Sequence, residues 1–184
     1  GVVSMAWIPR IPEIKTANGL TDSQFGMVLV ASSIGAVLGA QLSGRAIHKF
    51  GSRPVMYFSA VIVPTGVTLM GVSPNAWVLV LGLFTMGFGY ASLDIGGNAQ
   101  ALAIEKHLSK RYITSFHGMW SIGTLAATLL GASVAYLLTP AQNLVGVALL
   151  GMLVFFYATA RLLPRHLDEH RGTGEVETKS SIPW

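Results

Sequence analysis

The sequence contains no cysteine and very little charge. The absence of cysteine excludes disulfides and cysteine-based metal clusters, and the motifs HExxH and GxSxG of metal-dependent and serine hydrolysis are missing too. Only 11% of the residues are charged, against about 25% in soluble domains, whereas 52% are hydrophobic. The composition indicates a membrane protein, argues against an enzyme, and offers no site for a metal or a cofactor.

Charge is missing above all from two long stretches. Residues 54–93 and 112–160 contain no Asp, Glu, Lys or Arg, and His117 is their one ionisable imidazole. A membrane-spanning helix needs about 20 residues, so each stretch is long enough for two spans. The sequence therefore predicts an all-α membrane protein, a bundle of six transmembrane helices at about 1–9, 23–47, 54–72, 76–104, 112–138 and 144–163.

Several local signals mark the ends of the predicted helices. Pro9 and Pro12 are expected to end the first helix, because proline has no backbone N–H to continue the hydrogen-bond ladder. A polar connector, EIKTANGLTDSQ, follows. Within it, Thr21 or Asp22 is a candidate N-cap for the second helix, with Gln24 close behind as in a capping box.

The chain is also expected to be a fragment with a truncated first helix. Only eight residues precede Pro9, and eight helical residues rise only about 12 Å. Residues 1–163 are predicted to form the transmembrane bundle. The polar residues 164–184 are predicted to be a cytoplasmic linker.

The distribution of Lys and Arg predicts the orientation in the membrane. Ten of these cations fall on one side of the predicted spans, in the loops 44–53 and 104–111 and in the carboxy-terminal tail, and only Arg10 and Lys15 fall on the other. The positive-inside rule places the ten in the cytoplasm, which predicts a multi-pass protein of the cell (inner) membrane. The rule also accounts for the basic charge without nucleic acid as a partner. Arg10 is expected to be an interfacial cation or to meet an anionic group of a substrate.

Glycine is concentrated within the predicted helices. The second helix contains Gly35 and Gly39 in a GxxxG spacing, and the fourth contains Gly82, Gly87 and Gly89. Small residues allow helix backbones to approach closely in lipid. Close packing is the expected result, and helices that slide against one another are the alternative.

Asp94 is the one acid inside the predicted spans. Placing a carboxylate at this depth costs about 2.5–3.5 kcal/mol on insertion scales, and such acids usually mark a solute or ion pathway. Tyr90, Asp94 and Asn98 recur at a spacing of four, which gives one polar stripe along a helix. We expect this stripe to face a solute or proton pathway. The alternative is a structural acid held by Asn98 and a neighbouring helix.

The fifth predicted helix supplies a facing set of side chains. His117, Trp120 and Ser121 share one face at i, i+3 and i+4. His117 is a candidate proton relay or hydrogen-bond partner of a substrate hydroxyl, and Trp120 is a candidate stacking surface for a sugar ring. Alternatively, the histidine is bonded to a neighbour and the tryptophan only packs.

The segment GRAIHKFGSRPV resembles the G-x-x-x-D-R-x-G-R-R turn of the major facilitator superfamily. Gly44, Lys49, Gly51 and Arg53 match that pattern, whereas His48 and Ser52 replace the Asp and one Arg. The resemblance implies a loop that contacts neighbouring helices and stabilises one end state of a transport cycle. Loss of the Asp puts the usual charge-paired form of that contact in doubt.

A second segment, residues 93–126, resembles the D-x-x-x-N-x-Q…E…FH-x-x-(W/F)-S-x-G pattern of fucose-permease-like, sugar-porter-like bacterial members of that superfamily. The resemblance covers residues 1–163 and implies the amino-terminal six-helix half of a twelve-helix transporter, whose carboxy-terminal half lies outside this chain. Glu105, at the start of the inner loop, is expected to be a structural or gating acid that pairs with the 44–53 turn. Many proton-coupled members carry an Arg early in the fourth helix, and residues 79–89 contain none.

These observations predict a secondary active transporter of a small polar, sugar-like solute that works by alternating access, with proton coupling as a further expectation. Its partners would be the small-molecule substrate, protons, the lipid bilayer and the missing six-helix half. The alternative is a non-transporting membrane sensor or scaffold built on a transporter fold, because fold does not dictate activity.

Overall fold

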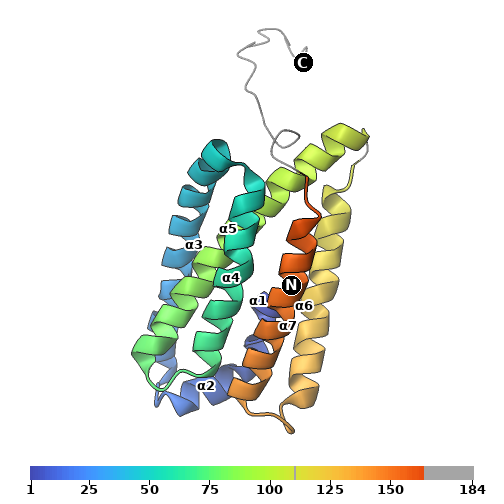
Figure 1. Cartoon of the computed structure of the whole chain (residues 1–184). Coiled ribbons are helices and arrows are strands. Elements are labelled where there is room, and N and C mark those ends of the chain that lie inside the picture. The colour runs from blue at the N-terminus through green and yellow to red at the C-terminus, as the bar shows by residue number, and fades with distance from the viewer. Residues whose placement is uncertain (110, 164–184) are drawn as a thin grey trace, which may run out of the picture.

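Helices make up all the regular structure of the computed structural model, which describes residues 1–109 and 111–163. Long helices run up and down beside one another, and a short one lies across one end (Figure 1). In chain order the elements are α1 (Val2–Met5), the 3-10 turn η1 (Ile8–Arg10), α2 (Ile11–Ala17), α3 (Asp22–Phe50), α4 (Ser52–Gly71), α5 (Ala76–Leu108), α6 (Ile113–Val134) and α7 (Pro140–Ala160).

The first predicted helix does not end at its prolines. Pro9 lies in the first positions of η1 and Pro12 in those of α2. Proline is tolerated there, because the N–H that it lacks has no partner within the helix. α1 already ends at Met5, turn residues follow at Ala6 and Trp7, and helical structure resumes in η1 and continues to Ala17. The first part of the predicted polar connector is therefore helical.

Capping side chains begin α3 and α7. Thr21 is the N-cap of α3 and forms a capping box with Gln24, which confirms the predicted signal. Thr139 and Gln142 form the same arrangement at α7. Because Pro140 can occupy the first turn after this cap, α7 begins at 140 rather than at the predicted 144.

The chain reverses between α3 and α4 within a single residue. Gly51 lies between the two helices with φ 86°, a conformation that favours glycine. The predicted loop 44–53 is therefore mostly helical, and α3 extends to Phe50. Ser109, with φ 53°, ends α5 four residues beyond the predicted 104.

Glycines bring α5 into close contact with both α3 and α4. A Cβ at Gly39 of α3 would lie 2.9 Å from Cα of Phe88, and one at Gly82 would lie 2.9 Å from the backbone nitrogen of Met70 in α4. The predicted close packing is confirmed, and α5 forms the centre of this part of the bundle. The apolar core lies where α3, α4 and α5 meet and continues to α1, and Val63, Val67 and Leu83 are fully buried in it.

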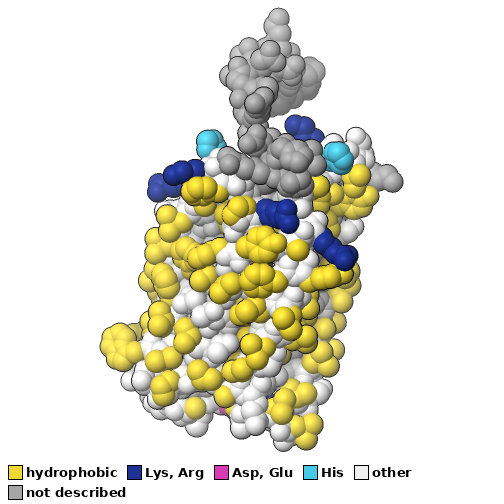
Figure 2. All heavy atoms as spheres, in the orientation of Figure 1, with side chains coloured by type: hydrophobic (Ala, Val, Ile, Leu, Met, Phe, Trp, Pro, Cys, Tyr) yellow, Lys and Arg dark blue, Asp and Glu magenta, His cyan; other side chains and the backbone are white. Residues whose placement is uncertain are grey.

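Four of the described helices, α3, α4, α5 and α7, are long and apolar enough to cross a membrane. The 22 residues of α6 also have the length, but Ser, Thr and His side chains lower its hydropathy. Lys and Arg gather at one end of the molecule, above sides rich in apolar side chains (Figure 2). The described cations at this end are Arg45, Lys49, Arg53, Lys106, Arg111 and Arg161, whereas Lys110 and the predicted linker 164–184 with Arg165, Arg171 and Lys179 lie outside the described residues.

Candidate functional site

A pocket of about 410 Å³ lies between α5 and α6. Small-molecule sites usually have volumes of about 300–1,000 Å³, so the pocket has the size of one. Met56 of α4, Leu162 beyond α7 and Gly1 complete its wall. The α5 residues that line it are Tyr90, Leu93, Asp94, Gly97, Asn98, Gln100, Ala101 and Ile104, and the α6 residues are Phe116, His117 and Trp120.

The polar stripe of α5 faces this pocket. Tyr90, Asp94 and Asn98 are one helical turn apart and all line it. The Asn98 amide donates a hydrogen bond to Oδ2 of Asp94 over 3.4 Å. None of the described residues that line the pocket is Lys or Arg. Asp94 is the one acidic side chain among the described residues of this wall.

The two glycines after Asp94 have different surroundings. A Cβ at Gly97 would meet no atom within 4 Å, and this residue lines the pocket. A Cβ at Gly96 would lie 3.0 Å from Sδ of Met56, so this residue packs against α4. The lack of a side chain at Gly97 leaves space in the pocket beside the Asp94 carboxylate. The lack of one at Gly96 lets α4 pack closely against α5.

The α6 wall contains two of the three predicted side chains. His117 and Trp120 line the pocket, and Trp120 interacts with the Tyr90 side chain across from it. Nδ1 of His117 is 3.3 Å from the carbonyl oxygen of Ile113 in its own helix. Ser121 does not line the pocket, and its hydroxyl donates to the His117 carbonyl over 3.0 Å.

Sequence reasoning missed Gln100, which closes one side of the pocket. Its side chain is only 2% exposed. Its amide nitrogen donates to Oγ of Ser52 over 2.7 Å and to the Leu163 carbonyl over 3.2 Å, and its oxygen accepts from the Leu163 N–H over 3.1 Å. Gln100 therefore holds α5, the start of α4 and the chain after α7 together. The sequence did contain a signal that could have identified this residue, because Gln100 is the glutamine of the D-x-x-x-N-x-Q pattern.

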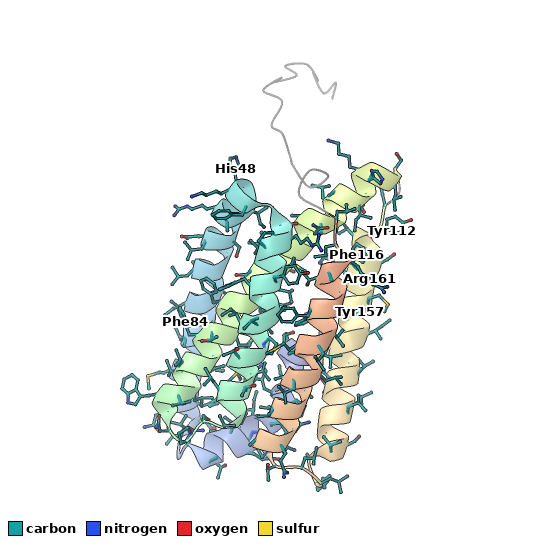
Figure 3. All side chains as sticks on the ribbon, viewed as in Figure 1. His48, Phe84, Tyr112, Phe116, Tyr157 and Arg161 are labelled. Atoms are coloured by element: carbon teal, nitrogen blue, oxygen red, sulfur yellow. The ribbon has the colours of Figure 1, made fainter. Side chains whose placement is uncertain are left out.

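The other missed residues of the wall are apolar. Phe116 stacks with Tyr112, with ring centroids 6.5 Å apart, near the start of α6 (Figure 3). Whether these apolar side chains line the pocket depends on how α5 and α6 are placed relative to each other, and sequence periodicity does not specify that placement. The remaining members are Met56, Leu93, Ala101, Ile104 and Leu162.

The predicted gating turn contacts α7 through Arg53. Its Nη2 donates to the Ala160 carbonyl over 2.9 Å, and its guanidinium lies over the Tyr57 ring. Lys49 lies over the Phe50 ring. His48 stands at the charged end of α3 (Figure 3), and Gly44 is an exposed residue within that helix rather than part of a loop.

Glu105 makes a different contact from the predicted pairing with the 44–53 turn. Its carboxylate accepts hydrogen bonds from the backbone N–H groups of Tyr112 and Ile113, the latter over 2.8 Å. The first N–H groups of a helix lack partners within it and favour negative charge. Glu105 therefore fixes the connection from α5 to the start of α6.

Arg10 is buried and is not among the residues that line the pocket between α5 and α6. Its side chain is fully buried, donates to the Leu138 carbonyl in the connection between α6 and α7, and lies 3.2 Å from the Glu13 carboxylate. A buried cation is tolerated only when it is paired or hydrogen-bonded. Arg10 ties the bend between α1 and α2 to the connection between α6 and α7.

Comparison with known proteins gives the family. The Major Facilitator Superfamily model matches residues 2–184. An uncharacterized transporter of Sinorhizobium fredii is 29% identical over 78% of this chain and 37% of its own length. Membrane protein MosC of Rhizobium meliloti is 32% identical over 70% of this chain and 32% of its own length. An uncharacterized MFS-type transporter of Yersinia pestis is 26% identical over 95% of this chain and 44% of its own length. The chain thus spans less than half the length of these relatives. More distant ones are named for glucose, tetracycline resistance, D-xylose and nitrate.

Proposed function

The chain belongs to the major facilitator superfamily, and we propose that it forms one half of a secondary transporter that moves a small polar solute across the membrane. The protein is a multi-pass membrane protein and a transporter rather than an enzyme. In this proposal, the pocket between α5 and α6 is this chain's share of the solute site. A second six-helix half supplies the facing wall, and the two halves rock about the site so that it opens to one side of the membrane at a time.

The side chains of the pocket favour an uncharged solute rich in hydroxyl groups, such as a monosaccharide. Asp94 and Asn98 offer an acceptor and a mixed donor–acceptor amide beside each other, while Trp120 offers an aromatic face. An anionic solute is disfavoured, because the Asp94 carboxylate lines the wall and none of the described lining residues is Lys or Arg. Relatives named for glucose and D-xylose are in keeping with this choice, and they stand beside others named for tetracycline resistance and nitrate.

Asp94 is also the proposed proton carrier. It is the one carboxyl of the described residues in the middle of a membrane-spanning helix, and it lines the pocket rather than facing the apolar core. A carboxyl that binds a proton from one side and releases it to the other couples solute movement to the proton gradient, which is worth about 2.3 kcal/mol per charge per 100 mV. His117 lines the same pocket and is the candidate relay.

Transport by purified protein tests this function. The protein, produced with any residues that flank this chain, is reconstituted into liposomes, and uptake of labelled monosaccharides is followed together with internal pH. We expect sugar uptake to acidify the lumen when sugar is the only gradient. Asp94→Asn should abolish sugar-driven proton movement while sugar binding persists. Proton movement that is unchanged in this variant would refute the role of Asp94.

The second candidate is a sensor or scaffold that binds a solute without moving it. The observation that favours it is His48, which replaces the acid of the family's turn and so removes a charge pair expected of a cycling transporter. This candidate predicts solute binding, seen as thermal stabilisation of the protein, with no flux in liposomes. Flux of any solute that also stabilises the protein excludes it.

A further inference from the structure

Gly97 is a glycine within α5 that neither packing nor backbone geometry requires. A Cβ at this position would meet no atom of the described residues within 4 Å, and Gly97 is not among the described glycines with positive φ. The other glycines of α5 differ, because a Cβ at Gly82, Gly87, Gly89 or Gly96 would lie 3.0 Å or less from an atom of another helix. Glycine is the least favourable residue in a helix interior after proline. A reason for Gly97 must therefore be sought in the space that it leaves open.

The open space at Gly97 belongs to the pocket between α5 and α6. Gly97 lines this pocket three residues after Asp94, which lines it too. Leu93 and Ala101 lie one turn before and one turn after Gly97 on the same face of α5 and also line the pocket. The pocket wall of α5 therefore has two parallel stripes, the polar stripe and an apolar stripe of Leu93, Gly97 and Ala101. The apolar stripe has a recess at Gly97.

A carbon atom suits this recess better than a hydroxyl group does. The side chains of Leu93 and Ala101 offer no hydrogen bond, and the carbonyl groups within a helix are already bonded along it. A hydroxyl group placed in the recess would therefore exchange water for a site with few partners. The carboxylate of Asp94 and the amide of Asn98 offer such partners beside it. A solute that fits both stripes presents hydroxyl groups to one and a carbon substituent to the other.

We propose that Gly97 is a specificity-determining residue that makes room for the exocyclic hydroxymethyl carbon of a hexose, an inference that rests on the proposed function as a monosaccharide site. Glucose has this CH2OH group on its pyranose ring, whereas xylose has a hydrogen atom in the same place. In the proposed complex the exocyclic carbon lies in the recess, and ring hydroxyl groups meet Asp94 and Asn98. The pocket then accepts both sugars, and any side chain at position 97 excludes the hexose first.

Binding of D-glucose and D-xylose to Gly97→Ala tests this assignment. The protein is purified with any residues that flank this chain, and its thermal stabilisation over a series of sugar concentrations gives both dissociation constants. Gly118→Ala is the matched control, because it makes the same change in α6 next to His117. Its Cβ would meet no atom of the described residues within 4 Å, and Gly118 does not line the pocket. The measured quantity is the ratio of the glucose constant to the xylose constant in each variant.

We expect Gly97→Ala to weaken glucose binding by about 10–200-fold, the usual effect of one methylene group in an apolar pocket, and to leave xylose binding nearly unchanged. Gly118→Ala should leave both constants as they are in the parent protein. Without sugar, Gly97→Ala should unfold at the temperature of the parent protein or above it, because alanine favours helix over glycine and its Cβ has room.

The contrary results separate this inference from the proposed function. If the parent protein binds both sugars and Gly97→Ala leaves the ratio unchanged, the role of Gly97 is refuted and the proposed function stands. Equal weakening of both sugars, or a loss of stability of Gly97→Ala without sugar, would assign the glycine to contact with another helix and overturn the inference. A parent protein that binds neither sugar would refute the monosaccharide site, and the inference with it.

Discussion

Substituting Gly39 by alanine tests the close approach of α3 to α5, on which the position of the pocket wall depends. The added Cβ would lie 2.9 Å from Cα and 3.0 Å from the carbonyl carbon of Phe88. Carbon atoms prefer separations of about 3.5–4.0 Å, so both distances are repulsive overlaps. Because backbone atoms cannot rotate away, the two helices must move apart.

The expected cost is about 1–3 kcal/mol, the usual range for overpacking, reduced by up to about 1 kcal/mol because alanine favours helix over glycine. Gly44→Ala is the matched control, since it makes the same change in the same helix and its Cβ would meet no atom within 4 Å. Unfolding in mixed detergent micelles measures both free energies. We expect Gly39→Ala to be clearly less stable than Gly44→Ala. Equal stability of the two variants would refute the close contact.

Substitutions at three further positions, each occupied by a hydrogen-bonded side chain, are measured by the free energy of unfolding. Glu105→Ala should cost about 0.5–2 kcal/mol, the value of a helix cap, while Glu105→Gln should recover most of it; equal losses would contradict the capping role. Gln100→Leu should cost about 1–3 kcal/mol, because the N–H and C=O of Leu163 lose their partner; an unchanged stability would disprove the clamp. Thr139→Ala should cost about 1 kcal/mol and Thr139→Ser almost nothing, and any larger loss for serine would argue against the cap.

The helices, and the residues of α5 and α6 that line the same pocket, were predictable because they depend on patterns along the chain. Charge-free stretches indicated the spans, and helical spacing alone put Tyr90, Asp94 and Asn98 on one stripe. The antiparallel order of α5 and α6 then brought His117 and Trp120 to the same pocket. Thr21 and Gln24 gave the start of α3 for the same local reason.

The errors concern Arg10, Glu105 and Ser121, whose contacts are not specified by helical spacing alone. Arg10 is buried because Leu138 and Glu13 satisfy part of its guanidinium, and the pairing with Leu138 follows from the packing of α1 and η1 against α6. Glu105 was assigned to the wrong neighbour, because its spacing to the start of α6 depends on a turn whose geometry the sequence does not determine. Ser121 shares a helical face with His117, yet its hydroxyl bonds back to its own helix and leaves the pocket.

Chemical access to position 94 tests the central claim that this residue faces a water-filled pathway. Because residues 1–184 contain no cysteine, Asp94→Cys can be the sole thiol once any cysteines in flanking residues are replaced. Ser92→Cys, two residues away at a fully buried position, and Leu153→Cys on the apolar surface of α7 are the controls. In membrane vesicles treated with a charged methanethiosulfonate, we predict rapid labelling at 94 and little at 92 or 153. Labelling at 94 as slow as at the two controls would contradict the account.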